Sequence, residues 1–411
     1  MRSKSVSAAT AAAILCACGA GTALAGNTVE TPVYSFTGNA DGGFPHGGLV
    51  SNGKGQFFGV TTSDGNGHNG VVFELQKPAK GQTNWTQTTL YAFTGGNDGA
   101  VPQAGLMRDA HGNLYGTTYQ GGADGYGVVF ELKRRHGAWK YKVLWTFTGG
   151  NDGGLPSGSL SMDAAGNLYG TASEGGTGVV GNVFELSPPA AGTTNWTESV
   201  LYNFTGNADG GEPMGNVLLG SDGNLYGTTA GYGQYNYGTV YKLTANGGGN
   251  WSFSVLHAFA GGSDGEVPRD GLIQDANGTL YGTTAGFDNS YGNVFELSTD
   301  GSNYNVLYNI PGTAGFTGNG PWQTVSMDST GALYGTTLAD GQSAYGEVFK
   351  LTPGQNNQWT ARVLYTFPGG AGSQEPYSTV LIGKHHMLYG TSYGSAGEGG
   401  FYPGTIWQIK Q

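Results

Sequence analysis

The side chains that could do chemistry are those that interrupt a repeated pattern. A proline recurs at Pro45, Pro102, Pro156, Pro213, Pro268, Pro321 and Pro376. The residue that follows it differs each time, giving the series His46, Gln103, Ser157, Met214, Arg269, Trp322 and Tyr377. A varied position inside a constant repeat is where we expect a binding site.

Three acidic residues beside this position add charge. Glu212 and Glu375 precede their prolines, and Asp270 follows Arg269. Aromatic faces with carboxylates and an arginine suit sugar rings, because C–H groups stack on Trp or Tyr and hydroxyls bond to charged groups. We therefore predict one ligand-binding sector formed by His46, Glu212, Arg269, Asp270, Trp322, Glu375 and Tyr377. The competing interpretation is that these side chains face solvent at a rim or plug the axis.

The same residues allow two catalytic alternatives. Glu212 and Glu375 could act as acid and base in glycoside hydrolysis. His46 or Tyr377 could move a proton in the β-elimination of a uronide, while Arg269 neutralises the substrate carboxylate. Neither a nucleophile elbow nor a phosphate-binding loop is present. The sequence therefore favours a protein without catalytic residues and leaves enzymatic activity open.

A second set of acidic residues recurs in five repeats, at Asp41, Asp98, Asp152, Asp209 and Asp264. A partial acidic ring could bind Ca²⁺ or sugar hydroxyls. An Asx turn explains the pattern better, because an aspartate before glycine accepts N–H groups of its own loop. The spacing of a calcium-binding loop is absent. We expect no metal and no cofactor, and these five aspartates are the candidates if Ca²⁺ binds.

The elements that must position these side chains repeat seven times. Leu-Tyr-Gly-Thr-Thr, or a variant, places an aromatic residue at Phe58, Tyr115, Tyr169, Tyr226, Tyr281, Tyr334 and Tyr389. A Val-Phe-Glu-Leu type run follows each copy, and an alternating segment follows that run. Four short strand signals with a period in the mid-fifties predict a propeller blade. The predicted fold is all-β, a seven-bladed β-propeller with four-stranded blades.

The two ends of the repeat region predict how the ring closes. The last repeat stops at its third strand, Thr405–Lys410, and the segment Thr31–Phe36 resembles a fourth strand. The N-terminal strand should therefore complete the last blade and leave no open sheet edge. We predict one domain over 26–411, with repeats near 33–89, 90–143, 144–200, 201–255, 256–306, 307–363 and 364–411.

Strand direction predicts which face carries the function. With strands A to D in each blade, the D–A and B–C loops share one face, and these loops are rich in Gly, Asp and Asn. We take this as the functional face. Its B–C loops add four aromatic binding candidates, Tyr232, Tyr235, Phe287 and Tyr393.

Composition excludes several classes of protein. The chain has 79 Gly and 15 Pro in 411 residues, only 11 % charged residues and a net charge of −11. It has no heptads, and no apolar stretch of membrane-spanning length follows the N-terminus, which excludes a coiled coil and a multi-pass membrane protein. The basic residues form no run longer than Lys133-Arg134-Arg135, so we expect no nucleic-acid partner.

The N-terminal segment has the features of a secretion signal. Arg2 and Lys4 precede an Ala-rich apolar run, and Ala23-Leu24-Ala25 is a small-x-small cleavage site. We predict a signal peptide over 1–25 and a secreted, periplasmic or cell-surface protein. Both cysteines, Cys16 and Cys18, fall inside the removed segment, so no disulfide is expected. Lipidation at Cys18 is the alternative.

The repeats resemble a known family. Phe-Thr-Gly-Gly-Asn-Asp-Gly at 93–99, Gly-Asn-Leu-Tyr-Gly-Thr-Thr at 112–118 and Gly-Val-Val-Phe-Glu-Leu at 127–132 are similar to the GloVer tandem repeat of bacterial exported, choice-of-anchor proteins. The resemblance covers 33–411. It implies an exported repeat protein, with no established activity and no catalytic residues to carry over. The C-terminal anchor of such proteins is not visible here.

These observations predict an exported, non-catalytic, monomeric propeller that binds a glycan or an envelope protein through its D–A/B–C loop face. The alternatives are a carbohydrate-active enzyme, either a polysaccharide lyase or a glycoside hydrolase, and a structural protein of the envelope. A structural protein would have a loop face without a pocket.

Overall fold

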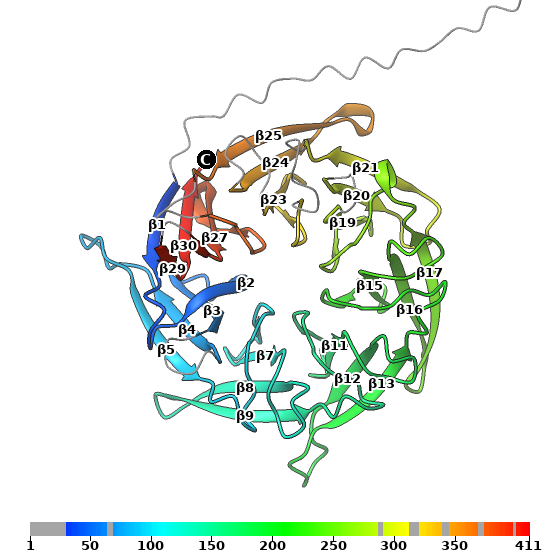
Figure 1. Ribbon diagram of the computed structural model, residues 1–411, viewed down its shortest axis with the longest axis horizontal. Coiled ribbons are helices and arrows are strands. Elements are labelled where there is room, and N and C mark those ends of the chain that lie inside the picture. The colour runs from blue at the N-terminus through cyan, green and yellow to red at the C-terminus, as the bar shows by residue number, and fades with distance from the viewer. Residues whose placement is uncertain are drawn as a thin grey trace, which may run out of the picture.

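The ring of blades is the dominant feature of the computed structural model, which describes residues 30–63, 69–286, 291–311, 320–338, 345–368, 374–397 and 400–411. Seven four-stranded antiparallel sheets stand around a central axis (Figure 1). The predicted all-β, seven-bladed propeller is therefore confirmed. Within the described ranges the only helical segments are three short 3-10 turns, η1 (Gly262–Asp264), η2 (Gln355–Asn357) and η3 (Lys384–His386).

The four strands of each blade run outward from the axis in the order A to D (Figure 1). Strand A is two residues long except in blade 1: β2 (Gly43–Ser51), β6 (Met107–Arg108), β10 (Ser161–Met162), β14 (Leu218–Leu219), β18 (Ile273–Gln274), β22 (Ser326–Met327) and β26 (Leu381–Ile382). Strand B carries the Leu-Tyr-Gly-Thr-Thr element: β3 (Gln56–Ser63), β7 (Leu114–Thr118), β11 (Leu168–Ala172), β15 (Leu225–Thr229), β19 (Leu280–Thr284), β23 (Leu333–Thr337) and β27 (Met387–Ser392).

The outer two strands complete each blade. Strand C carries the apolar run: β4 (Val71–Gln76), β8 (Val128–Arg135), β12 (Asn182–Ser187), β16 (Thr239–Gly247), β20 (Asn293–Leu297), β24 (Glu347–Pro353) and β30 (Thr405–Lys410). Strand D forms the outer wall: β5 (Thr86–Ala92), β9 (Ala138–Thr146), β13 (Thr197–Asn203), β17 (Asn250–Ala258), β21 (Tyr304–Asn309), β25 (Trp359–Thr366) and β1 (Glu30–Ser35).

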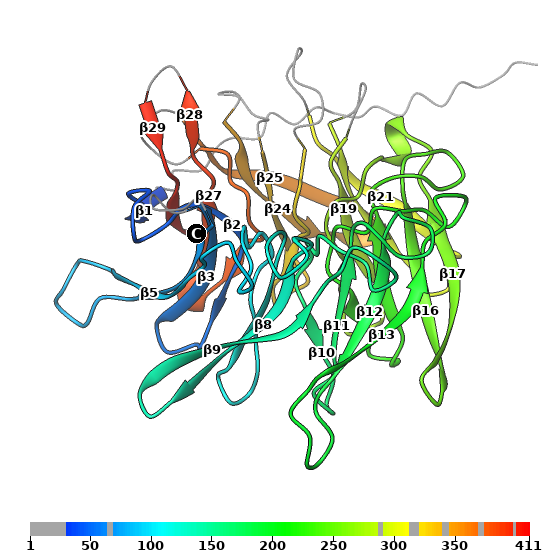
Figure 2. The same cartoon turned by 60° about the horizontal axis from the view of Figure 1, so that its bottom comes forward.

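Blade 7 joins the two ends of the ring. Its sheet has the order β1-β30-β27-β26, and β1 pairs antiparallel with β30, with Glu30 opposite Ile409. The predicted closure by the N-terminal strand is therefore confirmed. A further hairpin, β28 (Ser395–Gly397) and β29 (Gly400–Tyr402), is inserted between β27 and β30 and projects from one face of the ring (Figure 2).

The packing within a blade depends on a glycine at the centre of strand B. In blade 2, Gly116 lies directly opposite Phe130 of strand C, and a Cβ built on Gly116 would stand 2.6 Å from the Cζ of that ring. The same pair recurs around the ring, with Tyr241 or Trp407 replacing phenylalanine in blades 4 and 7. The strand B glycine therefore leaves the space that the largest aromatic ring in the core of each blade occupies.

The neighbouring residues of the same element fasten one blade to the next. The first threonine donates a hydrogen bond to a carbonyl in the segment that precedes strand A of the following blade, as in Thr228 Oγ1 to Asp270 O at 2.7 Å. The tyrosine packs between blades and, in most repeats, donates its hydroxyl to the A–B turn aspartate, as in Tyr226 to Asp222 at 2.7 Å. The apolar core is accordingly divided into clusters, each shared by two adjacent blades.

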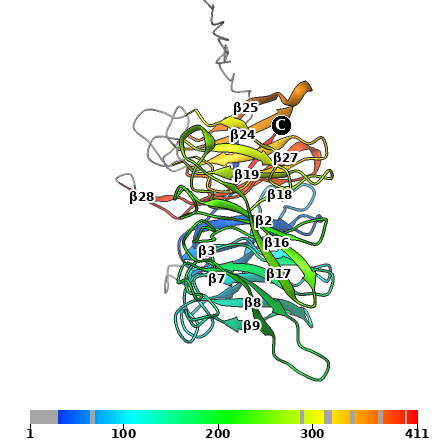
Figure 3. The same ribbon diagram turned by 90° about the vertical axis from the view of Figure 1, so that its right-hand side faces the viewer.

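Loops project from both faces of the ring (Figure 3). The D–A and B–C loops lie on one face, and the A–B turns and C–D hairpins lie on the other. Two surfaces of different composition are therefore available for binding, and the first of them contains the residues after the prolines.

Replacing Gly116 by alanine should destabilise the protein by about 1–3 kcal/mol, because the added methyl group overlaps Phe130 and a packed core yields little. Chemical denaturation of the variant measures this change. Gly96→Ala is the matched control, because a Cβ there would meet its nearest atom at 3.5 Å, and stability should change by less than about 0.5 kcal/mol. Equal stability of the two variants would contradict the packing argument.

Candidate functional site

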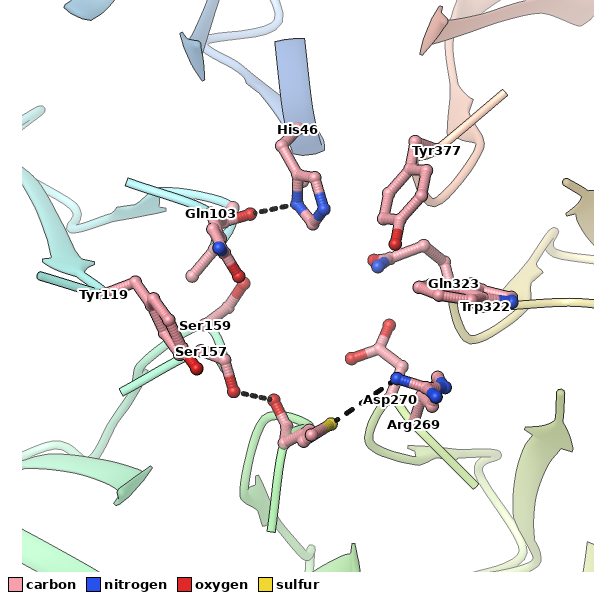
Figure 4. Close-up of a pocket in the computed structure, with 14 residues that line it drawn as sticks. His46, Gln103, Tyr119, Ser157, Ser159, Arg269, Asp270, Trp322, Gln323 and Tyr377 are labelled. Atoms are coloured by element: carbon pink, nitrogen blue, oxygen red, sulfur yellow. Dashed lines mark hydrogen bonds between the residues drawn. The ribbon is translucent and has the colours of Figure 1, made fainter. Parts of the chain in front are cut away.

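The seven residues that follow the prolines meet at the axis. They line a cavity of about 200 Å³ that opens on the D–A/B–C face (Figure 4): His46, Gln103, Ser157, Met214, Arg269, Trp322 and Tyr377. Each blade thus contributes one side chain from the same position of its repeat. The sequence pattern located the floor and walls of this pocket, whereas ligand binding stays a prediction.

A strained residue before six of the seven repeat prolines turns the chain toward the axis. Phe44, Val101, Leu155, Glu212, Val267 and Glu375 have φ between 52° and 57°, a region that residues other than glycine rarely adopt. Two blades hold this conformation in place. Glu212 N donates to Val180 O of blade 3, and Glu212 O accepts from Ala230 N of its own blade, at 2.8 and 3.0 Å. The backbone strain is therefore spread over the ring.

One half of the pocket wall is polar. The imidazole Nδ1 of His46 lies 2.7 Å from Gln103 O, and Ser157 Oγ donates to Met214 O at 3.0 Å. Since a carbonyl only accepts, Nδ1 carries the proton and Nε2 keeps its lone pair. Burial lowers the pKa of His46 to about 4, so the ring is neutral at pH 7. His46 therefore offers an acceptor at Nε2.

The other half is aromatic and cationic. The ring centroids of Trp322 and Tyr377 are 5.2 Å apart in an edge-to-face arrangement, and Tyr377 lies 4.2 Å from the His46 ring. The Arg269 guanidinium carbon stands 4.3 Å from the Trp322 ring centroid. Among the described residues, no carboxylate lies within ion-pair distance of Arg269. This wall therefore combines π faces with a cation that stacks rather than ion-pairs.

Asp270 lines the same pocket but serves the backbone. Its carboxylate accepts from Gly271 N and Thr324 N, both at 2.8 Å, which ties blade 5 to blade 6. Burial raises the pKa of Asp270 above its ordinary value, although the backbone donors partly offset this effect. Asp270 thus fixes the pocket wall, with a carboxylate edge on the cavity.

Glu212 and Glu375 do not line the pocket, which corrects the expected sector. Both occupy the strained position before proline. Their side chains are not among those that line the pocket at the axis. Burial, and then the charges of Glu174 and Glu212, raise the pKa of Tyr119, and burial raises the pKa of Glu375. They stand in blades 4 and 7, so the pocket holds no facing pair of glutamates.

The sequence did not assign three of the lining residues to this pocket: Ser159, Gln323 and Tyr119. Tyr119 directly follows strand B of blade 2, and Tyr393 directly follows that of blade 7, where its ring centroid lies 5.5 Å from that of Tyr377. Their common place, four residues after the strand B aromatic, was the available signal. Tyr232 and Tyr235 lie in a B–C loop and do not line the pocket, and Phe287 lies outside the described residues.

The five loop aspartates have a structural role. Thr205 N and Thr205 Oγ1 donate to Asp209 at 2.8 and 2.6 Å, and Tyr202 donates to it at 3.0 Å. Asp41 and Asp98 repeat this arrangement, Asp152 lacks only the tyrosine, and Asp264 accepts from Ala260 N and His257 Nε2. In the part of the chain that the structure describes, no three His, Cys, Asp or Glu side chains gather as a metal site.

The comparisons with known proteins bear on the family. The model of the Gloeobacter/Verrucomicrobia repeat matches residues 19–218 and again 213–411. The chain belongs to this repeat family. No curated protein matches it. Across the described ranges, no helix is long and apolar enough to cross a membrane.

Two solved structures are similar in fold to this Gloeobacter/Verrucomicrobia repeat protein. One is a provisional oxidoreductase (glucose dehydrogenase) from Thermus thermophilus, 15 % identical over 93 % of this chain and 99 % of the other, with a TM-score of 0.42. The other is a protein of unknown function from Dyadobacter fermentans, 12 % identical over 92 % and 96 %, with a TM-score of 0.45. At these identities neither structure bears on activity.

A repeat-breaking carboxyl on strand D gives this fold a pH dependence. In three blades the corresponding side chain, Gln87, Tyr141 or Tyr304, donates to the carbonyl of a loop aspartate. Blade 3 has Glu198, whose Oε1 is buried without a hydrogen-bond partner. Burial and the neighbouring Asp152 charge raise the pKa of Glu198 to about 7. Only the protonated carboxyl can donate as the other three side chains do.

The melting temperature should therefore fall as the pH rises from about 5 to 8. The folded-state pKa of Glu198 lies above the usual carboxyl value, so this stabilisation is complete at low pH and is lost through pH 7. Glu198→Gln keeps a donor and should reduce the fall, melting about 2 °C or more above the parent at pH 8. Glu185→Gln, on the adjacent strand, should keep the parental slope. An unchanged slope in Glu198→Gln would refute this explanation.

Proposed function

We propose that the protein is exported and holds one sugar unit of a glycan in its axial pocket. The observation that carries the proposal is the wall formed by Trp322, Tyr377 and Arg269. Flat aromatic faces stack on the C–H faces of pyranose rings, and a guanidinium donates in a fixed plane to ring hydroxyls or a carboxylate.

The opposite wall supplies the complementary polar contacts. His46 offers Nε2 as an acceptor, while Gln103 and Gln323 carry amides that both donate and accept. A sugar hydroxyl does the same, so both roles can be matched. The cavity of about 200 Å³ is smaller than the ~300–1,000 Å³ of sites for drug-sized ligands, which favours a single ring. A narrow concave site also fits a small ligand better than a protein surface.

A uronide lyase is the second candidate, favoured by the neutral His46 beside Tyr377. Burial keeps Tyr377 protonated by raising its pKa, while His46 can accept a proton. Arg269 could neutralise a substrate carboxylate, His46 could take the adjacent carbon-bound proton, and Tyr377 could protonate the departing oxygen. A glycoside hydrolase based on Glu212 and Glu375 has no such support, because neither residue lines the pocket.

Replacing Trp322 by alanine should weaken sugar binding at least tenfold and change the melting temperature by only a few degrees, because the ring lines the pocket and is only partly buried. Binding is measured by calorimetry against neutral and acidic oligosaccharides. Trp85→Ala is the matched control, because Trp85 packs against Phe57 on the outer wall of blade 1 and should leave affinity unchanged.

Two results would overturn the assignment. If Trp322→Ala unfolds the protein, the residue is part of the core rather than of a binding site. If the parent protein binds no member of the panel, the axial pocket is not a sugar site. New absorbance of an unsaturated uronide during the same assay would identify the lyase, and substitution of His46 by glutamine should then abolish that absorbance.

Export rests on the predicted leader. The chain recovered from the envelope or medium should begin at Gly26, which N-terminal sequencing or intact mass determines. A chain that begins at Cys18 with the mass of attached acyl groups would establish the lipoprotein alternative instead. Recovery of the intact 411-residue chain in the cytoplasm would contradict both.

A further inference from the structure

The basic residues of this acidic protein are concentrated in one blade. Of the 17 Lys and Arg residues, blade 2 holds six: Arg108, Lys133, Arg134, Arg135, Lys140 and Lys142. No other blade holds more than three, and blade 3 holds none. A chain with a net charge of −11 therefore has a local concentration of cationic side chains in one blade.

Arg108 and Lys140 stand at positions of the repeat that are uncharged in the other blades. Arg108 occupies the strand A position that holds Ser51, Met162, Leu219, Gln274, Met327 and Ile382 in the other blades. Lys133 lies directly opposite Lys140, where blades 3, 4 and 6 pair hydroxyl side chains, such as Ser187 with Thr197. Like charges opposite each other destabilise a sheet. An anion bound at this surface would offset the repulsion between the two lysines.

The cationic residues border a groove between blades 2 and 3. The groove has a volume of about 890 Å³ and lies on the face of A–B turns and C–D hairpins, away from the mouth of the axial pocket. Figure 2 shows the β8–β9 hairpin on the side opposite the β28–β29 hairpin. Arg108, Lys133, Arg135 and Lys142 line the groove, and Trp196 with Pro188 and Pro189 forms an apolar flank.

The carboxylates in the groove are occupied by donors of the fold. Asp109 accepts from His111 N and from Asn113, and Asp163 is bound in the same way by its own turn. Glu131 accepts from Tyr115 and Lys133 at 3.0 and 3.3 Å.

Much of the cationic side remains available. The Nε of Arg108 is buried with no hydrogen-bond partner. Arg135 and Lys140 are exposed, with no carboxylate within ion-pair distance among the described residues. Arg135 and Lys140 are the donors that an external anion can reach.

We propose that this groove binds a linear acidic polysaccharide through its carboxylates. Guanidinium groups pair with carboxylates through two parallel hydrogen bonds, and the flank of Trp196 and the two prolines can cover a sugar ring. The three native carboxylates in the groove repel a densely phosphorylated chain more strongly than a chain with one carboxylate per sugar ring. The proposal is independent of the axial pocket, because it uses another face and other residues.

The test measures binding of polygalacturonate to the purified protein and to the triple variant Arg108→Met, Arg135→Asn and Lys140→Thr. Each substitution introduces a residue type found at the corresponding position of another blade. The parent should bind polygalacturonate with an affinity that falls steeply between 50 and 500 mM salt. The variant should lose at least tenfold in affinity and melt no lower than the parent, because the Lys133–Lys140 repulsion is gone.

The matched control removes three charges elsewhere, by Lys350→Thr, Arg362→Thr and Lys410→Thr. Lys350 lies opposite Arg362 in blade 6, a second like-charge pair, but its Nζ is 4.9 Å from the Tyr334 ring centroid. This control should bind polygalacturonate within about threefold of the parent. Trp322→Ala should also retain binding, which separates the groove from the axial site.

Four outcomes would overturn the proposal: no binding by the parent, equal loss in the control, equal binding of fully methyl-esterified polygalacturonate, or tighter binding of polyphosphate or DNA. The first two remove the site and the last two remove its assignment to a carboxylate polymer. Loss of binding confined to the blade 2 variant, with salt dependence, establishes it.

Discussion

The contact on which the whole ring depends is the aromatic ring of strand C lying on the bare glycine of strand B. The ring at Phe130 and its counterparts is too large to share a cross-strand pair with any side chain, so the partner position must have none. The aromatic ring in turn fills the space toward the neighbouring blade, where apolar clusters from two sheets meet. One residue without a side chain therefore sets the depth of every blade and the spacing between blades.

Because this contact recurs in every blade, the residues at the axis are not needed to hold the ring together. The clusters between blades and the Thr228-type hydrogen bonds join neighbours away from the centre, so the side chains after the prolines need not match one another. The ring can accommodate a histidine, a methionine, an arginine and a tryptophan at equivalent positions without loss of packing. Symmetric construction of the frame is what permits an asymmetric pocket.

The blades and the closure of the ring could be predicted from the sequence because the residues that form them recur in each repeat. The strand B glycine, the C-strand aromatic and the proline appear in every copy or nearly so, and the closing strand is visible as a fourth strand without its blade. The residues that line the axis could be placed for the same reason: His46, Arg269, Trp322 and Tyr377 share one register after proline.

The repeat pattern could not predict the side-chain direction or the burial of single residues. Glu212 and Glu375 are adjacent in sequence to pocket residues, but a positive φ, which no sequence pattern displayed, separates their side chains from the axis. The buried state of Glu198 depends on what lies in the loop beside it. The groove is formed by residues of two neighbouring blades, 2 and 3. It could not be predicted from the sequence of one repeat alone.

The pairing of Glu30 with Ile409 has a consequence for how the protein acquires its fold. Six blades consist of contiguous segments and can form one after another as the chain emerges, each on the one before. Blade 7 needs both ends of the chain, and the entropy cost of joining them grows with the logarithm of the intervening length. The ring should therefore exist as an open arc until synthesis is complete, with unprotected sheet edges and an exposed apolar surface. This late step leaves a long window for aggregation and for assistance by chaperones.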